Sequence, residues 1–140
     1  MIGAGLAIVL VAGLGLLLFL TTVNVSTKQK VQKSNLNLAL VRTRWQDITE
    51  QAKNQLHLKE ALIEADKLLD YILKGQGYNG ETMAQRIKAA EKSFTDKESV
   101  WRAHKLRNHM VHEFADVVPQ QVEHAIKDLG QAIRDLGVQL

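Results

Sequence analysis

An uninterrupted apolar run near the N-terminus constrains this chain most. Residues 2–20 read IGAGLAIVLVAGLGLLLFL, and no charged side chain appears before Lys28. A helix of this length can span about 30 Å of hydrocarbon. No basic segment precedes the run and no small-residue cleavage site follows it, which favours an uncleaved anchor over a signal peptide. We therefore expect residues 1–27 to be a transmembrane signal anchor, with membrane-embedded side chains that include Ile2, Leu6, Leu10, Leu14 and Leu18.

Basic side chains follow the apolar run. Five of them precede the first acidic residue, Asp47; they are Lys28, Lys30, Lys33, Arg42 and Arg44. Basic residues beside a membrane helix tend to stay on the cytoplasmic side. We therefore expect a single-pass protein of the cell membrane with a cytoplasmic C-terminal domain. Residues 28–42 would form a basic juxtamembrane tether that attracts the headgroups of anionic membrane lipid.

The rest of the chain is slightly acidic. The whole sequence has a net charge of +3, but from Trp45 onward it holds 13 basic and 15 acidic residues. This segment lacks the broad basic surface that duplex binding requires, so we expect no DNA partner. The chain has no cysteine, which excludes disulfides, thiol nucleophiles and thiolate metal sites.

Apolar residues recur at intervals of three and four throughout the later segments, a spacing that predicts amphipathic helices. The single proline and the scarcity of aromatic residues also favour helices over strands. A first helix is expected near residues 36–53. Thr82 and Thr95 each have the spacing of a capping box, and Pro119 suits the first turn of the last helix. The expected fold is all-α: an N-terminal transmembrane helix, then an antiparallel bundle of four to five helices over residues 43–140.

The stretch Trp101–Glu113 holds three of the five histidines and one of the two tryptophans. On a helix, one stripe of this region is apolar and would face the core; it consists of Ala103, Leu106, Met110, Phe114 and Val117. A second stripe lies roughly opposite and consists of Trp101, His104, Asn108 and His112. Arg107 lies on the border between the two. Imidazoles, an amide and an indole are unusual on a solvated face, so this second stripe is predicted to face something other than water.

The segment Arg107–His112, with the sequence RNHMVH, resembles the signature of HEPN domains: an arginine, a polar residue, three further residues and a histidine. Ala103–Glu113 as a whole looks like a HEPN-like group of small bacterial proteins, as do Glu64–Asp70 and Gly77–Gly80. The resemblance covers about residues 43–137. It implies an all-α domain that forms a homodimer and, in its catalytic members, a metal-independent endoribonuclease.

The resemblance implies catalytic roles for Arg107 and His112. His112 would exchange protons near neutral pH, and Arg107 would hold phosphate oxygens. The two residues are five apart, about 140° around one helix, and do not easily converge on one phosphate. A two-fold dimer presents the same patch twice and would bring the two roles together. The expected ligand is single-stranded RNA or a nucleotide, and the supporting residues would be His104, Asn108, Asp66 and Trp101.

Each of these residues also has a structural interpretation. Arg107 could form a buried ion pair with Asp66 or Asp70, and His112 could be an ordinary surface or interface histidine. His104 and Asn108 could link helices through hydrogen bonds, and Trp101 could pack in an interface.

His109, His112 and Glu113 have the wrong order for a known zinc motif and lack a third ligand, so neither a metal nor another cofactor is expected. Two functions stay open. One is a membrane-tethered, metal-independent RNase that acts as a dimer. The other is a non-catalytic HEPN-like module that dimerises, or binds a partner or nucleotide, at the membrane.

Overall fold

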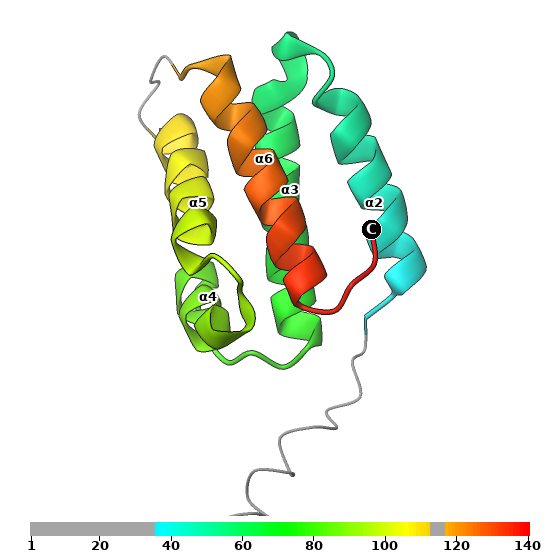
Figure 1. The fold of residues 1–140 in the computed structure, drawn as a ribbon, viewed down its shortest axis with the longest axis vertical. Helices are drawn as coiled ribbons and strands as arrows, with labels where there is room; N and C mark the ends of the chain where they lie inside the picture. Colours follow the sequence, from blue (N-terminus) through cyan, green and yellow to red (C-terminus); the bar gives the residue numbers. More distant parts are fainter. Residues whose placement is uncertain (1–35, 113–116) are drawn as a thin grey trace, which may run out of the picture. The chain divides into compact units, whose positions relative to one another are not determined.

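The computed structural model describes residues 36–112 and 117–140. The predicted anchor and most of the predicted tether lie outside these residues. The described part is helical, with no strand (Figure 1). The α-helices are α2 (Leu38–Gln51), α3 (Leu58–Gly75), α4 (Met83–Ala90), α5 (Lys97–His112) and α6 (Pro119–Asp135). The prediction of an all-α bundle is confirmed for these ranges, and none of their helices is long and apolar enough to cross a membrane.

Four long helices form the bundle, and successive ones run in opposite directions (Figure 1). α3 packs against α2, α4, α5 and α6, and α5 packs against both α3 and α6. A short 3-10 turn (Gln55–His57) joins α2 to α3, and a second (Glu91–Ser93) follows α4. The short helix α4 lies at the end of the bundle where α5 begins (Figure 1). α5 therefore has neighbours on two sides, which decides where its polar residues lie.

The first helix lies where the sequence predicts it, near residues 36–53. α2 starts at Leu38, where the side chain of Asn37 accepts a hydrogen bond from the Leu40 amide at 3.0 Å. Val41 is fully buried in the core. Residues 38–42, assigned from their charge to the tether, are thus part of α2. A basic residue such as Arg42 can lie on the exposed side of a helix whose opposite side is buried.

The core is built mainly from the apolar stripes of α3 and α6, as the spacing predicts. The fully buried side chains of these helices include Leu62, Leu68, Leu69, Ile72, Leu73, Leu129 and Ile133. Burying each such side chain contributes roughly 1.5–3 kcal/mol relative to leaving it in water. Because α3 is covered on several sides, its one buried carboxylate, Asp66, lies inside the protein.

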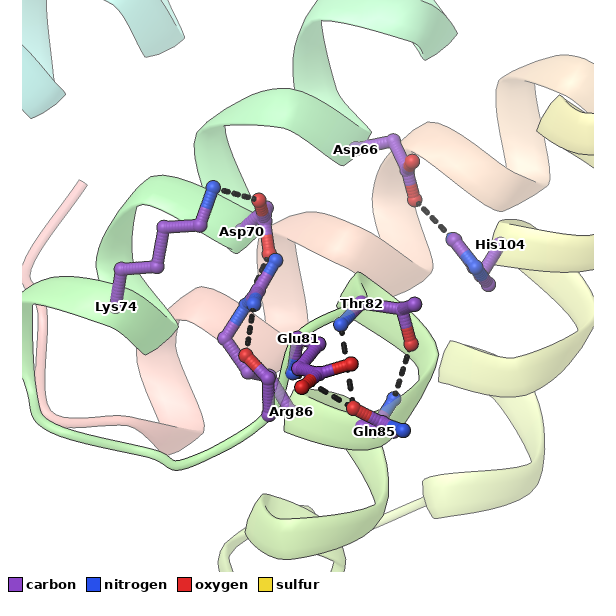
Figure 2. Close-up of polar contacts among 9 residues, drawn as sticks. Asp66, Asp70, Lys74, Glu81, Thr82, Gln85, Arg86 and His104 are labelled. Atoms are coloured by element: carbon purple, nitrogen blue, oxygen red, sulfur yellow. Dashed lines mark hydrogen bonds and ion pairs between the residues drawn. The ribbon is translucent and has the colours of Figure 1, made fainter.

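One of the two predicted capping boxes is present. At the start of α4, the Thr82 hydroxyl accepts from the Gln85 amide at 3.2 Å and the Gln85 side chain accepts in return from the Thr82 amide at 3.3 Å (Figure 2). At the start of α5 the prediction for Thr95 is wrong. Asp96 accepts instead from the Ser99 amide at 3.0 Å, because a carboxylate one position later has the same three-residue reach.

Asp70 and Arg86 fasten the turn between α3 and α4 (Figure 2). The buried Arg86 donates from Nε to Asp70 Oδ1 at 2.7 Å and from Nη1 to the Gly80 carbonyl at 2.5 Å. Lys74 Nζ lies 2.7 Å from Asp70 Oδ2. Asp70 is therefore occupied by two cations of its own region and is not the partner of Arg107.

Candidate functional site

Helix α5 buries a wider arc than a single apolar stripe. Ala103 and Met110 are buried as expected, but so are Ser99, Val100 and His104. His104 is one position after Ala103, about 100° around the helix, and this step takes it from the α6 side towards α3. The stripe that the sequence places roughly opposite the core therefore includes a residue that contacts the same chain.

Asp66 and His104 form a buried pair between α3 and α5 (Figure 2). Asp66 is 1% exposed, and its Oδ1 lies 2.9 Å from His104 Nδ1. Its other oxygen, Oδ2, lies 3.3 Å from Arg107 Nε. A buried carboxylate is costly unless it is paired, and both of its oxygens have a partner on α5. Of the two acidic partners that the sequence left open for Arg107, the structure selects Asp66.

The side-chain amide of Asn108 links His104 to Arg107. Arg107 Nη1 donates to Asn108 Oδ1 at 2.8 Å. Because arginine has no acceptor, this amide oxygen must face Arg107 and the amide nitrogen must face His104. The Asn108 Nδ2 group lies 3.3 Å from His104 Nε2, which accepts from it when the ring carries its hydrogen on Nδ1. In that tautomer, His104 Nδ1–H donates to Asp66.

Arg107 lies at the border of the core, and 24% of its side chain is exposed. Its Nε atom is buried near Asp66 but makes no aligned hydrogen bond. The guanidinium is therefore oriented by Asp66 and Asn108 and still reaches the surface. Asp66 partly neutralises the charge of Arg107. Only the remaining positive charge is available to hold a phosphate.

His112 lies in the last turn of α5 and is exposed. It lines a shallow groove of about 600 Å³ along the outer side of α5. We call this the α5 groove; its lining residues are Arg102, Lys105, Leu106, Asn108, His109 and His112. Arg107 does not line it. Arg107 contacts α3 and His112 lines the groove, so within one subunit the two residues lie on different sides of α5. Asn108 contacts Arg107 and also lines the groove.

Trp101 contacts its own subunit. Its Nε1 donates to Glu91 Oε1 at 3.0 Å, and its ring meets the His104 ring edge-on, with centroids 6.3 Å apart. The ring is half-buried against the core. Within one chain, His104 contacts Asp66 of α3 and Trp101 contacts Glu91 of the 3-10 turn after α4. Their place at an interface with a second copy stays a prediction.

Sequence reasoning missed two residues of the α5 groove, Arg102 and Lys105. A signal was present, because positions 102, 105, 109 and 112 recur at helical spacing and are all basic or imidazole. Attention to the motif Arg107–His112 alone overlooks this row. In the ranges that the structure describes, no group of three or more histidine or acidic side chains is placed to hold a metal ion.

The candidate site therefore has two parts that meet at Asn108. One is the buried network of Asp66, His104, Asn108 and Arg107, and the other is the exposed α5 groove, which contains His112. No protein-family model, curated protein or solved structure matches this chain.

Proposed function

We propose that this chain is a membrane-tethered HEPN-like domain that acts, as a homodimer, as a metal-independent endoribonuclease on single-stranded RNA. The supporting observation is the state of Arg107, which is oriented by two partners and still 24% exposed, while His112 is exposed on the same helix. An Arg107 closed off completely by Asp66 would speak against a phosphate-binding role. The partial exposure leaves that role open to the guanidinium.

The chemistry follows from the two side chains. The RNA 2′-oxygen forms a bond to the adjacent phosphorus, and the bond from phosphorus to the 5′-oxygen breaks. A neutral His112 would accept the proton of the 2′-hydroxyl, and an acid would return a proton to the departing 5′-oxygen. Arg107 would stabilise the charge that develops on the phosphate oxygens. The products are a 2′,3′-cyclic phosphate and a 5′-hydroxyl, and no step requires a metal.

A homodimer completes the site in this proposal. Arg107 and His112 lie on different sides of one α5, which makes a shared phosphate within one subunit difficult. A two-fold axis beside α5 would present both residues twice. Arg107 of one protomer would then hold the phosphate next to the 2′-hydroxyl that His112 of the partner subunit deprotonates. Residues 1–27 would fix this dimer to the cytoplasmic face of the membrane, where two-dimensional confinement favours pairing.

A cleavage assay tests the proposed function. The full-length chain in non-ionic detergent is incubated with fluorescent single-stranded RNA, with and without a chelator. We expect cleavage in both conditions, and its loss in Arg107→Ala and His112→Ala. His57→Ala is the matched control, because His57 is an exposed histidine in the 3-10 turn before α3 and does not line the α5 groove. A mixture of the two inactive variants should recover part of the activity. Intact RNA with the folded wild type, or full inhibition by the chelator, would reject the proposal.

The buried network supports a second candidate, a non-catalytic HEPN-like module that dimerises or binds a partner or nucleotide at the membrane. Asp66, His104, Asn108 and Arg107 contact one another within one chain, which gives the motif residues a structural role without any substrate. This candidate predicts that Arg107→Ala strongly lowers the stability, and that a dimeric wild type leaves single-stranded RNA intact.

A further inference from the structure

A row of basic and imidazole side chains follows the α5 groove. Arg102, Lys105, His109 and His112 are separated by three, four and three residues, so they lie on one face of the helix. With a rise of about 1.5 Å per residue, the row is roughly 15 Å long. Among the residues that the structure describes, no carboxylate lines this groove. A row of this length on a shallow, open face of one helix suits a chain of negative charges better than a single small anion.

Lys105 and Arg102 are the two permanently charged side chains of the row. Lys105 is exposed and forms no ion pair with any residue in the described ranges. Arg102 is partly held in place, because its Nη2 donates to Ser99 Oγ at 2.8 Å, and it also lines a neighbouring cleft that contains Asp128. The charge of Lys105 is therefore less compensated by nearby acidic groups, whereas the guanidinium of Arg102 is held more firmly in one position.

We infer that the α5 groove binds the phosphodiester backbone of single-stranded RNA, with Lys105 and Arg102 as phosphate contacts outside the reaction centre. The inference rests on the proposed function, which places the scissile phosphate beside His112 at one end of the row. A strand held there would continue along α5 past Lys105 to Arg102. Leu106 and the Asn108 amide line the groove between Lys105 and His112 along the helix and would contact the sugars and base edges, which a single strand leaves accessible.

The net charge of the domain favours contact with nucleic acid at the groove over contact along a broad surface. From Trp45 to the C-terminus, acidic residues outnumber basic ones, 15 to 13, so a long duplex would also meet negative surface. A short single strand needs only the groove. Each phosphate that a cation neutralises contributes about −0.7 to the slope of log binding constant against log salt for single strands. At about 0.1 M salt, this corresponds to roughly fivefold in affinity per contact.

Binding is measured separately from cleavage. The probe is a short, fluorescent 2′-O-methyl oligoribonucleotide, which keeps the phosphates but has no 2′-hydroxyl to react. Fluorescence anisotropy with the full-length chain in non-ionic detergent, over a series of salt concentrations, gives both the affinity and the salt slope. Lys105→Gln should weaken binding about fivefold at about 0.1 M salt and reduce the slope by about 0.7. Arg102→Gln should act in the same direction.

Lys59→Gln is the matched control. Lys59 is also exposed and without an ion pair in the described ranges, but it lies on α3, away from the α5 groove. Its removal should leave both affinity and slope unchanged. Equal binding by Lys105→Gln, Lys59→Gln and the wild type would overturn the inference. It would also be overturned if the wild type bound vesicles of phosphatidylglycerol in a Lys105-dependent manner but not the oligonucleotide.

The outcomes separate the groove from the proposed reaction. If ordinary RNA stays intact while the 2′-O-methyl strand binds in a Lys105-dependent manner, the groove inference holds and the endoribonuclease proposal fails. If cleavage depends on Arg107 and His112 while Lys105→Gln and Arg102→Gln alter neither binding nor its salt slope, the reaction holds and the groove inference fails. Circular dichroism of each variant checks that the surface substitutions leave the fold intact.

Discussion

The His104 ring donates a hydrogen bond from Nδ1 to Asp66 Oδ1 over 2.9 Å, and both side chains are buried. The direction of this bond follows from Asn108, which must turn its amide oxygen to Arg107 and its amide nitrogen to His104. Asp66 is not part of the Arg–Asn…His motif, yet it holds the helix that carries the motif against α3. Asp66 connects α3 to two successive turns of α5.

Removing Asp66 should destabilise the bundle more than removing an ordinary acid. Asp66→Ala leaves His104 Nδ1 without its acceptor and Arg107 without its ion-pair partner, a loss of about 3 kcal/mol for a buried pair. Urea denaturation followed by circular dichroism measures the change. Asp47→Ala, which removes an exposed carboxylate of α2, should change stability by less than about 0.5 kcal/mol. Adding His104→Ala to Asp66→Ala should cost less than the sum of the single variants, because the two share one interaction. Strict additivity would contradict the pairing.

Gly130 is expected to be essential for the close packing of α6 on α2. A Cβ built at Gly130 would lie 2.5 Å from Cζ2 of the Trp45 ring. Gly130→Ala gains about 1 kcal/mol in helix propensity, but the overpacking should cost about 1–3 kcal/mol, so a net loss of stability is expected. Thermal denaturation measures it. Trp45→Phe frees space at the same place, so in that background Gly130→Ala should be less harmful. A more stable single variant would show that the ring moves aside easily.

The positions of the helices could be predicted from the sequence, because they depend on local spacing and on caps. The stripe of α6 shows this: Val122, Ile126, Leu129 and Ile133 recur with the helical period and are all buried. The start of α5 could not be assigned to Thr95 or Asp96 from spacing alone. Adjacent residues that can both cap a helix differ only in the backbone geometry that each adopts.

The surroundings of the motif could be predicted only in part. The pairing of Arg107 with Asp66 was one of two acidic alternatives, and Arg86 excludes the other by occupying Asp70. A helix-linking role for His104 was one of the alternatives, and its hydrogen bond to Asp66 confirms it. The burial of His104 was not predicted, for a physical reason. A stripe drawn on one helix assumes one packing neighbour, whereas α5 packs against both α3 and α6 and buries a wider arc. The order in which helices surround one another depends on contacts distant in sequence, which the period of one helix does not contain.

Acid should weaken the turn between α3 and α4. Burial acts to raise the pKa of Asp70, but hydrogen bonds and positive charge from Arg86 and Lys74 outweigh it, so this pKa is lowered from 3.8. A group whose pKa is lowered in the folded state contributes its stability above the unfolded value and loses it as the pH falls through the folded value. The wild type should therefore be more stable than Asp70→Asn near neutral pH.

The difference between these two proteins should shrink as the pH falls below about 4, because a protonated Asp70 resembles the amide of the variant. Urea denaturation over a pH series measures the difference in the free energy of unfolding. An unchanged difference at acidic pH would show that the carboxylate charge of Asp70 does not stabilise the turn.

Arg107→Ala and His112→Ala should differ in stability even if both abolish RNA cleavage. Arg107 contacts Asp66 and Asn108, so its removal leaves a buried carboxylate with one partner fewer and should cost about 1–3 kcal/mol. His112 is exposed in the last turn of α5, and its removal should change the free energy of unfolding by less than about 0.5 kcal/mol. Urea denaturation of both variants, beside His57→Ala, gives these values.

The two outcomes decide how the cleavage data are interpreted. If His112→Ala is as stable as the wild type and inactive, the lost activity reports the chemistry of the imidazole directly. The activity of Arg107→Ala must first be corrected for its folded fraction, and Arg107→Lys helps here. It keeps a positive charge near Asp66 but cannot hold phosphate oxygens through two parallel hydrogen bonds. A stable Arg107→Lys variant with lost cleavage would assign Arg107 to the phosphate. Restored stability together with restored cleavage would show that a positive charge beside Asp66 is sufficient at this position.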